Sequence, residues 1–293
     1  MKMNMKMKMK LSMVAGALAL AVAGQANAVI INNAGLGNTL ILSVWDATAN
    51  TSYTANLGST IQSFLSNAGV TFGGAANAPA ITGADKATNN FSFVDAGLTA
   101  FLATDVAANF QWSVVAATNS GGPLGYGTQG ILTTTSAPAT TVATMTAATL
   151  SAGVGFEGNY VASVNPLMGA NTSITTTAAA GAAAYVGGFG NGMGNNFGGN
   201  AAFSNTAGLG ESMSFFFVTP TTNARGQYAG SANYQFANAA GASSWTLGAS
   251  GLTYAAVSAV PEPSDWLLML SGVGLIGFIA SRRKDQDGSM TFA

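Results

Sequence analysis

Apolar and polar residues alternate with a period of two along much of this chain, and this pattern limits the fold more than any other sequence feature. Phe110, Trp112 and Val114 fall on one face of such a run, and Gln111 and Ser113 fall on the other. Alternation rich in β-branched and aromatic residues is typical of strands. Strands are predicted at 39–45, 52–57, 90–94, 110–117, 130–135, 212–218, 232–237 and 244–247, the last continuing toward 257. We therefore expect a mostly β chain with a single sandwich or jelly-roll-like domain, whose inward aromatics form the core.

Few segments have helical periodicity, so only short helices are expected. Ser59 can cap a helix that carries Ile61, Phe64, Leu65 and Ala68 at helical spacing and ends at Gly69. Similar patterns predict helices at 95–104 and 140–152. Residues 187–200 are mostly Gly and Asn, which predicts a long loop. That loop is either an adaptable binding or self-association segment or an insertion without a role.

The body of the chain carries very little charge. Only 6% of all residues are charged, against about 25% in an average soluble domain. Between residues 29 and 260 only Lys86 and Arg225 are basic. The acidic residues of the same stretch are Asp46, Asp85, Asp95, Asp105, Glu157 and Glu211. This balance excludes nucleic acid as a partner, because no basic patch can form. A neutral surface of hydroxyl and amide groups suits contact with other neutral polar polymers, such as polysaccharide, or with copies of the same chain.

The chain contains neither cysteine nor histidine, and this limits its chemistry. Disulfides, thiolate ligands and the usual general base near neutral pH are excluded. Glu157 and Glu211 are the best remaining candidates for a glycan hydrolase that works with acids alone, which ranks third among the functions considered. Asp85, Asp95 and Asp105 recur every ten residues but lack the pattern of a calcium loop. We therefore predict no enzyme activity, no catalytic residues, no cofactor and no metal.

The first 28 residues have the three parts of a secretory signal peptide. Residues 1–10 alternate Met with Lys, and residues 11–24 form an apolar segment. Ala26 and Ala28 form a small-x-small cleavage site for signal peptidase. The mature chain is therefore predicted to begin at Val29, after export across the inner membrane.

A second apolar segment lies near the other end of the sequence. Pro261, Glu262 and Pro263 precede a run at 266–281 that is predicted to form a transmembrane helix. The prolines separate this helix from the domain, because they cannot continue a helix that begins before them. Before any processing, this helix would hold the protein in the membrane.

The flanks of that helix predict its orientation. Trp266 is suited to the outer interface, and Arg282, Arg283 and Lys284 are suited to the cytoplasmic side. The resulting division is a signal peptide at 1–28, a β-rich extracytoplasmic domain at 29–256, a linker with the Pro-Glu-Pro motif at 257–265, a transmembrane sorting helix at 266–281 and a basic cytoplasmic tail at 282–293.

The order of Pro-Glu-Pro, short apolar helix and basic cluster resembles the PEP-CTERM sorting signal of Gram-negative bacteria. Ser264 matches the Thr or Ser that usually follows the motif, whereas the tail at 285–293 continues beyond the usual end. The resemblance implies recognition and cleavage by an exosortase, and release to the cell envelope or the extracellular matrix. It also implies a bacterium that makes exopolysaccharide and biofilm. A structural or adhesive role in that matrix is the predicted function, and a carbohydrate-binding module is the alternative.

Overall fold

A computed structural model of the 293-residue chain describes residues 30, 39–75, 78–118, 130–136, 147–177, 185–186, 205–222, 228–257, 268–276 and 278. The chain divides into two compact units, Met1–Val257 and Ser258–Ala293. Several predictions lie outside the described residues. These are the signal peptide with Ala26 and Ala28, the loop at 187–200, the motif Pro261, Glu262 and Pro263, and the flanking Trp266, Arg282, Arg283 and Lys284.

The first unit is built on one antiparallel sheet, which has eleven strands in the described part of the chain. The order along its main path is β5-β15-β14-β10-β7-β6-β1-β2-β8, while β11 pairs with β10 and β9 pairs with β6. The bounds of these strands are β1 Thr39–Asp46, β2 Thr51–Thr60, β5 Asn90–Phe93, β6 Phe110–Thr118, β7 Gly130–Thr135, β8 Ser173–Thr177, β9 Ala207–Gly208, β10 Ser212–Thr222, β11 Tyr228–Gln235, β14 Ser244–Gly248 and β15 Gly251–Ala255. Two small hairpins accompany the sheet, β3 Thr71–Ala75 with β4 Ala78–Thr82, and β12 Ala237–Asn238 with β13 Gly241–Ala242.

Most of the predicted strands are confirmed, and the mostly β class with them. The predictions at 39–45, 52–57, 90–94, 110–117, 130–135 and 212–218 correspond to β1, β2, β5, β6, β7 and β10. The run predicted from 244 toward 257 is instead a hairpin of β14 and β15. Gly251 explains the break, since its φ of 132° suits glycine and a Cβ there would lie 2.5 Å from the Phe93 carbonyl oxygen. The prediction at 232–237 spans the end of β11 and the start of β12. The short strands β3, β4 and β8 were not predicted.

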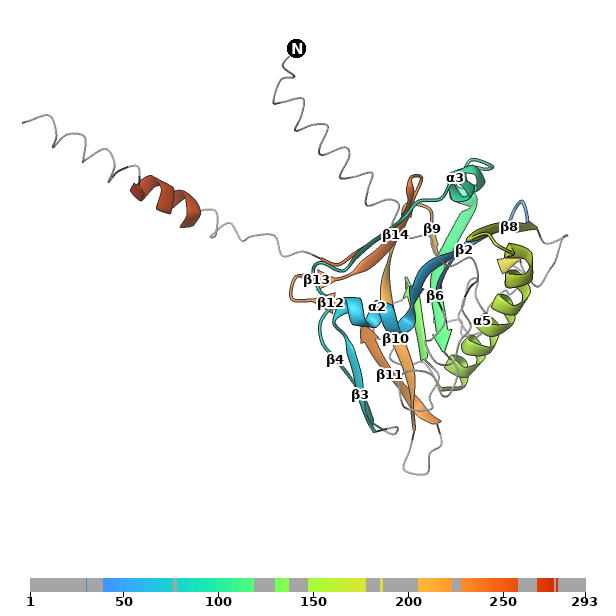
Figure 1. The fold of residues 1–293 in the computed structure, drawn as a ribbon, viewed down its shortest axis with the longest axis horizontal. Helices are drawn as coiled ribbons and strands as arrows, with labels where there is room; N and C mark the ends of the chain where they lie inside the picture. Colours follow the sequence, from blue (N-terminus) through green and yellow to red (C-terminus); the bar gives the residue numbers. More distant parts are fainter. Residues whose placement is uncertain are drawn as a thin grey trace, which may run out of the picture. The chain divides into compact units, whose positions relative to one another are not determined.

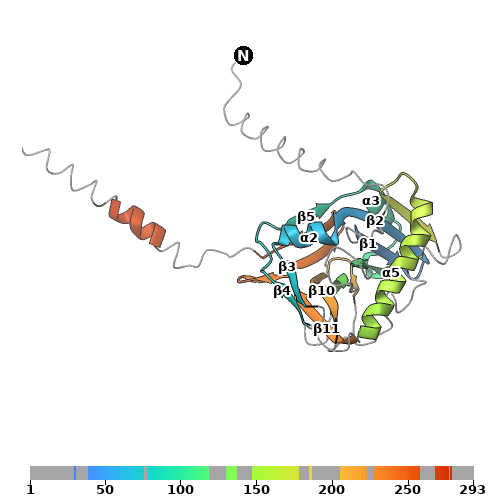
Figure 2. The ribbon, with the colours of Figure 1, turned by 60° about the horizontal axis from the view of Figure 1, so that its bottom comes forward.

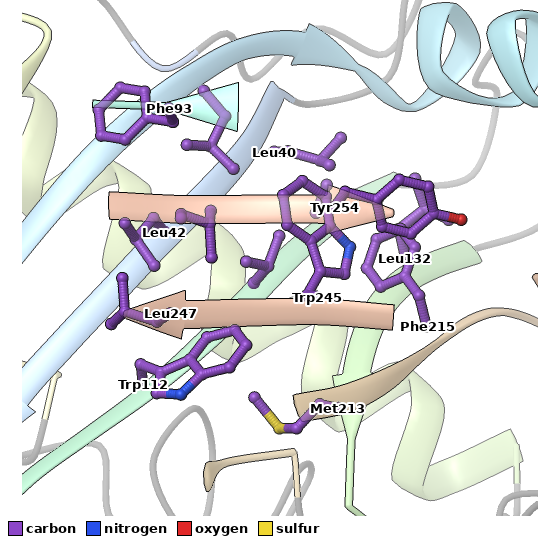
Figure 3. Close-up of a cluster of buried hydrophobic side chains, with 14 of the residues drawn as sticks. Leu40, Leu42, Phe93, Trp112, Leu132, Met213, Phe215, Trp245, Leu247 and Tyr254 are labelled. Carbon is purple, nitrogen blue, oxygen red and sulfur yellow. The ribbon is translucent and has the colours of Figure 1, made fainter. Parts of the chain in front are cut away.

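The expected sandwich of two sheets is replaced by one sheet that curls over its own inner face. Along this face lies the larger core cluster, which includes Leu42 of β1, Trp112 of β6, Phe215 of β10 and Trp245 of β14. Figure 3 shows the strands of Trp245 and Tyr254 crossing those of Leu42 and Trp112. Strands from the two halves of one hydrogen-bonded sheet therefore share a core, as the facing sheets of a sandwich do.

The other face of the sheet is covered by helix α5, Ala147–Met168, as Figures 1 and 2 show. Tyr160, Val161, Val164 and Met168 of this helix pack with a second cluster that includes Ile41, Val115 and Phe216. The prediction at 140–152 overlaps only the first turns of this 22-residue helix, and residues 140–146 lie outside the described part. The prediction fell short because Gly153, Gly155, Gly158 and Pro166 argue against a long helix.

The first predicted helix is confirmed as α2, Ile61–Ala68, but its capping residue was wrong. Thr60, not Ser59, is the N-cap, because its Oγ1 accepts the Ser63 amide at 3.1 Å. Gly69 ends the helix with a φ of 77°, as predicted. Phe64 of α2 points into the inner core, where it contacts the rings of Phe215, Phe236, Trp245 and Tyr254.

The second predicted helix is confirmed as α3, Ala96–Leu102, with Asp95 as its N-cap. In the second unit, residues 268–276 are helical and exposed. Among the helices that the structure describes, none combines the length and apolar character needed to cross a membrane. The transmembrane helix expected at 266–281 therefore stays a prediction.

Candidate functional sites: buried carboxylates and the C-terminal motif

Asp85 adjoins Lys86 in the sequence, which favours a solvated surface pair, but the structure buries Asp85 and leaves Lys86 exposed. Asp85 is only 1% exposed. The hydroxyls of Ser243 and Tyr254 both donate to its Oδ2, and Nδ2 of Asn89 donates to Oδ1 at 2.7 Å. Lys86 is exposed instead. A carboxylate with three donors is well satisfied inside a protein, so Asp85 anchors its loop to the sheet.

Burial raises the pKa of Tyr254 above the ordinary tyrosine value, and the hydrogen bond to Asp85 raises this pKa further. Tyr254 therefore stays protonated and remains a donor at neutral pH. The backbone adds a further link, because the Asp85 amide donates to the Ala237 carbonyl at 2.9 Å. This cluster is complete without a ligand.

Asp95 joins three elements near the far edge of the sheet. Its Oδ1 accepts the Leu98 amide of α3 at 3.0 Å, the Tyr53 hydroxyl of β2 at 2.9 Å and the Ser173 hydroxyl of β8 at 3.3 Å. This carboxylate therefore holds α3 against the strands β2 and β8.

Asp46 and Asp105, which are far apart in the sequence, form a carboxylate pair that sequence reasoning missed. Asp46 ends β1 and is fully buried. Its Oδ1 accepts the amides of Thr48 at 2.7 Å and Ala49 at 2.9 Å. Its Oδ2 has no hydrogen-bond partner in the described part of the chain. The sequence offered one hint, because the acidic residue Asp46 directly follows the strand predicted at 39–45.

The Asp105 carboxylate belongs to the turn that precedes β6. Its Oδ2 accepts Nδ2 of Asn109 at 2.9 Å, and its Oδ1 accepts the Val106 amide at 2.7 Å. These two hydrogen bonds, and then an interaction with the Asp46 carboxyl, lower the pKa of Asp105 below its ordinary value.

The other acids of the β domain are the glutamates Glu157 and Glu211. Glu211 turns back on its own loop, where its Oε2 accepts the Gly208 amide at 2.8 Å. Glu157 lies in α5, and its side chain falls outside the described part. Within the described ranges, no three acidic side chains gather as a metal centre would require, so Asp85, Asp95 and Asp105 do not share a site despite their regular spacing.

The C-terminal motif was compared with known protein families. Residues 259–284 match the family model described as the PEP-CTERM protein-sorting motif. This chain carries a PEP-CTERM sorting signal. The match spans Pro261, Glu262 and Pro263, the apolar run and the basic cluster. The roles of these individual residues stay predictions.

A PEP-CTERM signal implies that the protein is exported and processed at the membrane on its way to the cell envelope, with an exosortase as the processing partner. Comparisons with curated proteins and with solved structures gave no significant match to the chain. The PEP-CTERM motif therefore identifies the route of the protein, and the β domain must be interpreted from its own residues.

Proposed function

We propose that this protein is a non-enzymatic structural or adhesive component of an exopolysaccharide matrix, to which its PEP-CTERM signal delivers it. The observation that carries this proposal is the nearly uncharged surface of the β domain combined with an aromatic core. Lys86 is the one basic residue in the described part of the chain. A surface with so few charged groups offers mainly neutral hydrogen-bonding groups to a matrix polymer or to a second copy of the chain.

The placement of the aromatic residues supports this role over the alternative of a carbohydrate-binding module. Such modules stack sugars on exposed aromatic rings. Trp45, Trp112 and Trp245 are all buried, and Phe91 and Tyr234 are partly covered by the inner core. The alternative now depends on side chains outside the described residues, such as Phe189 and Phe197 in the Gly/Asn-rich loop.

The placement of the acids likewise gives no support to the acid-based hydrolase. Asp46 and Asp85 are buried, and Asp95 is bound by groups of its own fold. A glycan must reach both carboxylates of a hydrolase. In the Asp46–Asp105 pair only Asp105 is partly exposed.

The proposal is tested by deleting the gene in a bacterium that makes the protein and measuring floc or biofilm cohesion. We expect cohesion to fall and to return when the wild-type gene is restored. A gene whose product lacks Pro261–Pro263 is the matched control, because its β domain is intact but is not sorted. Unchanged cohesion after deletion, with matrix polysaccharide still produced, contradicts the matrix role.

A glycan array separates the structural role from the alternative. The exported protein, recovered from the medium or the envelope, is expected to show weak contact with many neutral polymers. Saturable binding to one class of sugar would instead support a carbohydrate-binding module.

A further inference from the structure

The outer face of the sheet is covered by α5 only in part. This helix packs against β6, β7, β8, β10 and β11. At one end of the sheet β10, β14, β15 and β5 lie side by side in that order. Their apolar side chains belong to the inner core cluster drawn in Figure 3, which includes Met213, Phe215, Trp245, Leu247, Tyr254 and Phe93. Because successive side chains of a strand alternate between the two faces, the residues between these face outward.

The outward residues of the four strands form two rows across the sheet. In the first row Ser212 of β10 lies opposite Thr246 of β14. The row continues with Thr253 of β15 and Ser92 of β5. The second row is formed in the same way by Ser214, Ser244, Ala255 and Asn90. Neighbouring strands lie about 4.8 Å apart, so each row is about 14 Å long. We call these eight residues the hydroxyl face.

The first row of hydroxyls is accessible from solvent. Ser92, Ser212 and Thr253 are exposed, and Thr246 is half-buried. The hydroxyls of Ser212 and Thr246 contact each other at 2.5 Å, and the Thr253 hydroxyl donates to the Thr246 carbonyl at 3.4 Å. A hydroxyl has one donor and two acceptor lone pairs, so these contacts leave hydrogen-bonding groups for a ligand.

The composition of the hydroxyl face selects the kind of partner. None of its eight side chains is charged, and none is larger than Asn. A charged polymer would therefore find no opposite charge on it. A protein partner would find none of the aromatic or Arg anchors that dominate protein interfaces. Val94, which follows β5, is exposed, but one valine does not provide such an anchor. A polymer of neutral sugars presents hydroxyls, which pair with those of the face as both donors and acceptors.

We propose that the hydroxyl face binds neutral polysaccharide through hydrogen bonds. This inference rests on the proposed matrix function and assigns the contact with the matrix to one surface of the β domain. A neutral hydrogen bond contributes little net free energy, so a single copy binds weakly. A long polymer that contacts several copies adds these contacts together, which suits an adhesive component of a matrix.

The test uses the exported protein and the exopolysaccharide of the gene-deletion strain, which anion exchange separates into a neutral and an acidic fraction. Each fraction is immobilised, and binding is measured over a series of protein concentrations. We expect the wild-type protein to bind the neutral fraction. The double variant Thr246→Val and Thr253→Val keeps the shape of both side chains and removes two hydroxyls of the face. Its binding should be about fivefold weaker or more, as expected for two lost hydrogen bonds.

Thr71→Val combined with Thr82→Val is the matched control. These threonines are also exposed and lie opposite each other in a hairpin, with their hydroxyls 2.9 Å apart. The control should bind as the wild type does. Valine favours strands, and thermal unfolding checks that both double variants keep the fold. Ser92→Ala removes an exposed hydroxyl from the same row and tests the face if the first variant fails to fold.

Three results would overturn the inference. One is equal binding by the wild type and the face variant, and another is wild-type protein that does not bind the neutral fraction. The third is a face variant that binds polysaccharide normally but no longer self-associates in sedimentation, which would assign the face to a second copy of the chain.

The deletion strain separates this inference from the proposed function. Restoring the gene with Thr246→Val and Thr253→Val should leave cohesion low, whereas the control variant should restore it. Full restoration by the face variant overturns the inference and leaves the matrix role in place. Unchanged cohesion after deletion of the gene contradicts the matrix role itself.

Discussion

Single buried polar groups hold together several loops in the part of the chain that the structure describes. The clearest case is the loop at 83–89, which two tyrosines bind in different ways. Tyr254 donates its hydroxyl to the buried carboxylate of Asp85, whereas Tyr234 donates to the exposed backbone carbonyl of Gly83 at 3.2 Å. The two hydroxyls therefore allow a charged, buried hydrogen bond to be compared with a neutral, exposed one in the same loop.

Tyr254→Phe is expected to lower the free energy of unfolding by about 1.5–3 kcal/mol, because it removes a hydrogen bond to a charged group inside the protein. Tyr234→Phe, the matched control, should cost less than about 1 kcal/mol. Urea unfolding at pH 7 measures both. Equal losses in the two variants would contradict a special role for Asp85.

Buried tyrosines also set the alkaline limit of stability. Burial raises the pKa of Tyr160 above its ordinary value near 10. Above about pH 10 the unfolded chain releases this proton and the folded chain keeps it, so stability is complete below pH 10 and is lost as pH rises further. One such tyrosine makes the free energy of unfolding fall by about 1.4 kcal/mol per pH unit.

Tyr160→Phe should therefore make this alkaline slope shallower by about 1.4 kcal/mol per pH unit, as measured by denaturant unfolding between pH 9 and 12. Phe216→Leu, in the same cluster between α5 and the sheet, is the control that should lower stability without changing the slope. An unchanged slope in Tyr160→Phe would show that this hydroxyl ionises in the folded protein.

At the scale of elements, the ends of α2 show how local chemistry places a short helix. Neighbouring hydroxyls, Ser59 and Thr60, both have the residue type of a cap. Only Thr60 reaches the free Ser63 amide, whereas the Ser59 hydroxyl contacts the Ser63 hydroxyl. The helix matters beyond its length of eight residues, because it brings Phe64 into the aromatic centre of the inner core.

Thr60→Ala should destabilise the domain by about 1 kcal/mol through loss of the N-cap. Ser59→Ala removes a hydroxyl one residue earlier and should lower the free energy of unfolding by only a few tenths of a kcal/mol. Thermal or denaturant unfolding of the two variants provides the comparison. A larger loss in Ser59→Ala would assign the cap to the residue expected from sequence.

At the scale of the whole molecule, the two units have different tasks. The β domain buries its aromatic side chains in two clusters on the two faces of one curled sheet. The unit from Ser258 onward contains the PEP-CTERM motif, which directs export and processing. We therefore expect the domain to keep its core when the sorting segment is removed.

The mass of the exported protein tests this separation. We expect the mature form to lack residues 1–28 and the segment beyond the Pro-Glu-Pro motif. Glu262→Ala, which alters the motif and leaves the domain intact, should accumulate in the membrane with the segment 266–293 retained. A wild-type form that retains this segment would indicate a permanent anchor instead of a sorting signal.

Much of this protein follows from local patterns in the sequence. Period-two alternation was enough to locate β1, β6, β7 and β10, because each side chain's direction in a strand depends only on its position along the chain. The PEP-CTERM motif was likewise recognisable, because it is contiguous and has a fixed order. Gly69 marked the end of α2 for the same local reason.

Only the tertiary structure decided which of these pieces meet. Alternation does not determine strand order. It therefore could not distinguish one curled sheet, covered on its other face by α5, from a sandwich of two sheets. Nor could spacing reveal that Asp85 is buried by Ser243 and Tyr254, or that Asp95 binds side chains of β2 and β8. Such contacts depend on long-range pairing, because a charge's surroundings are set by the strands that fold beside it.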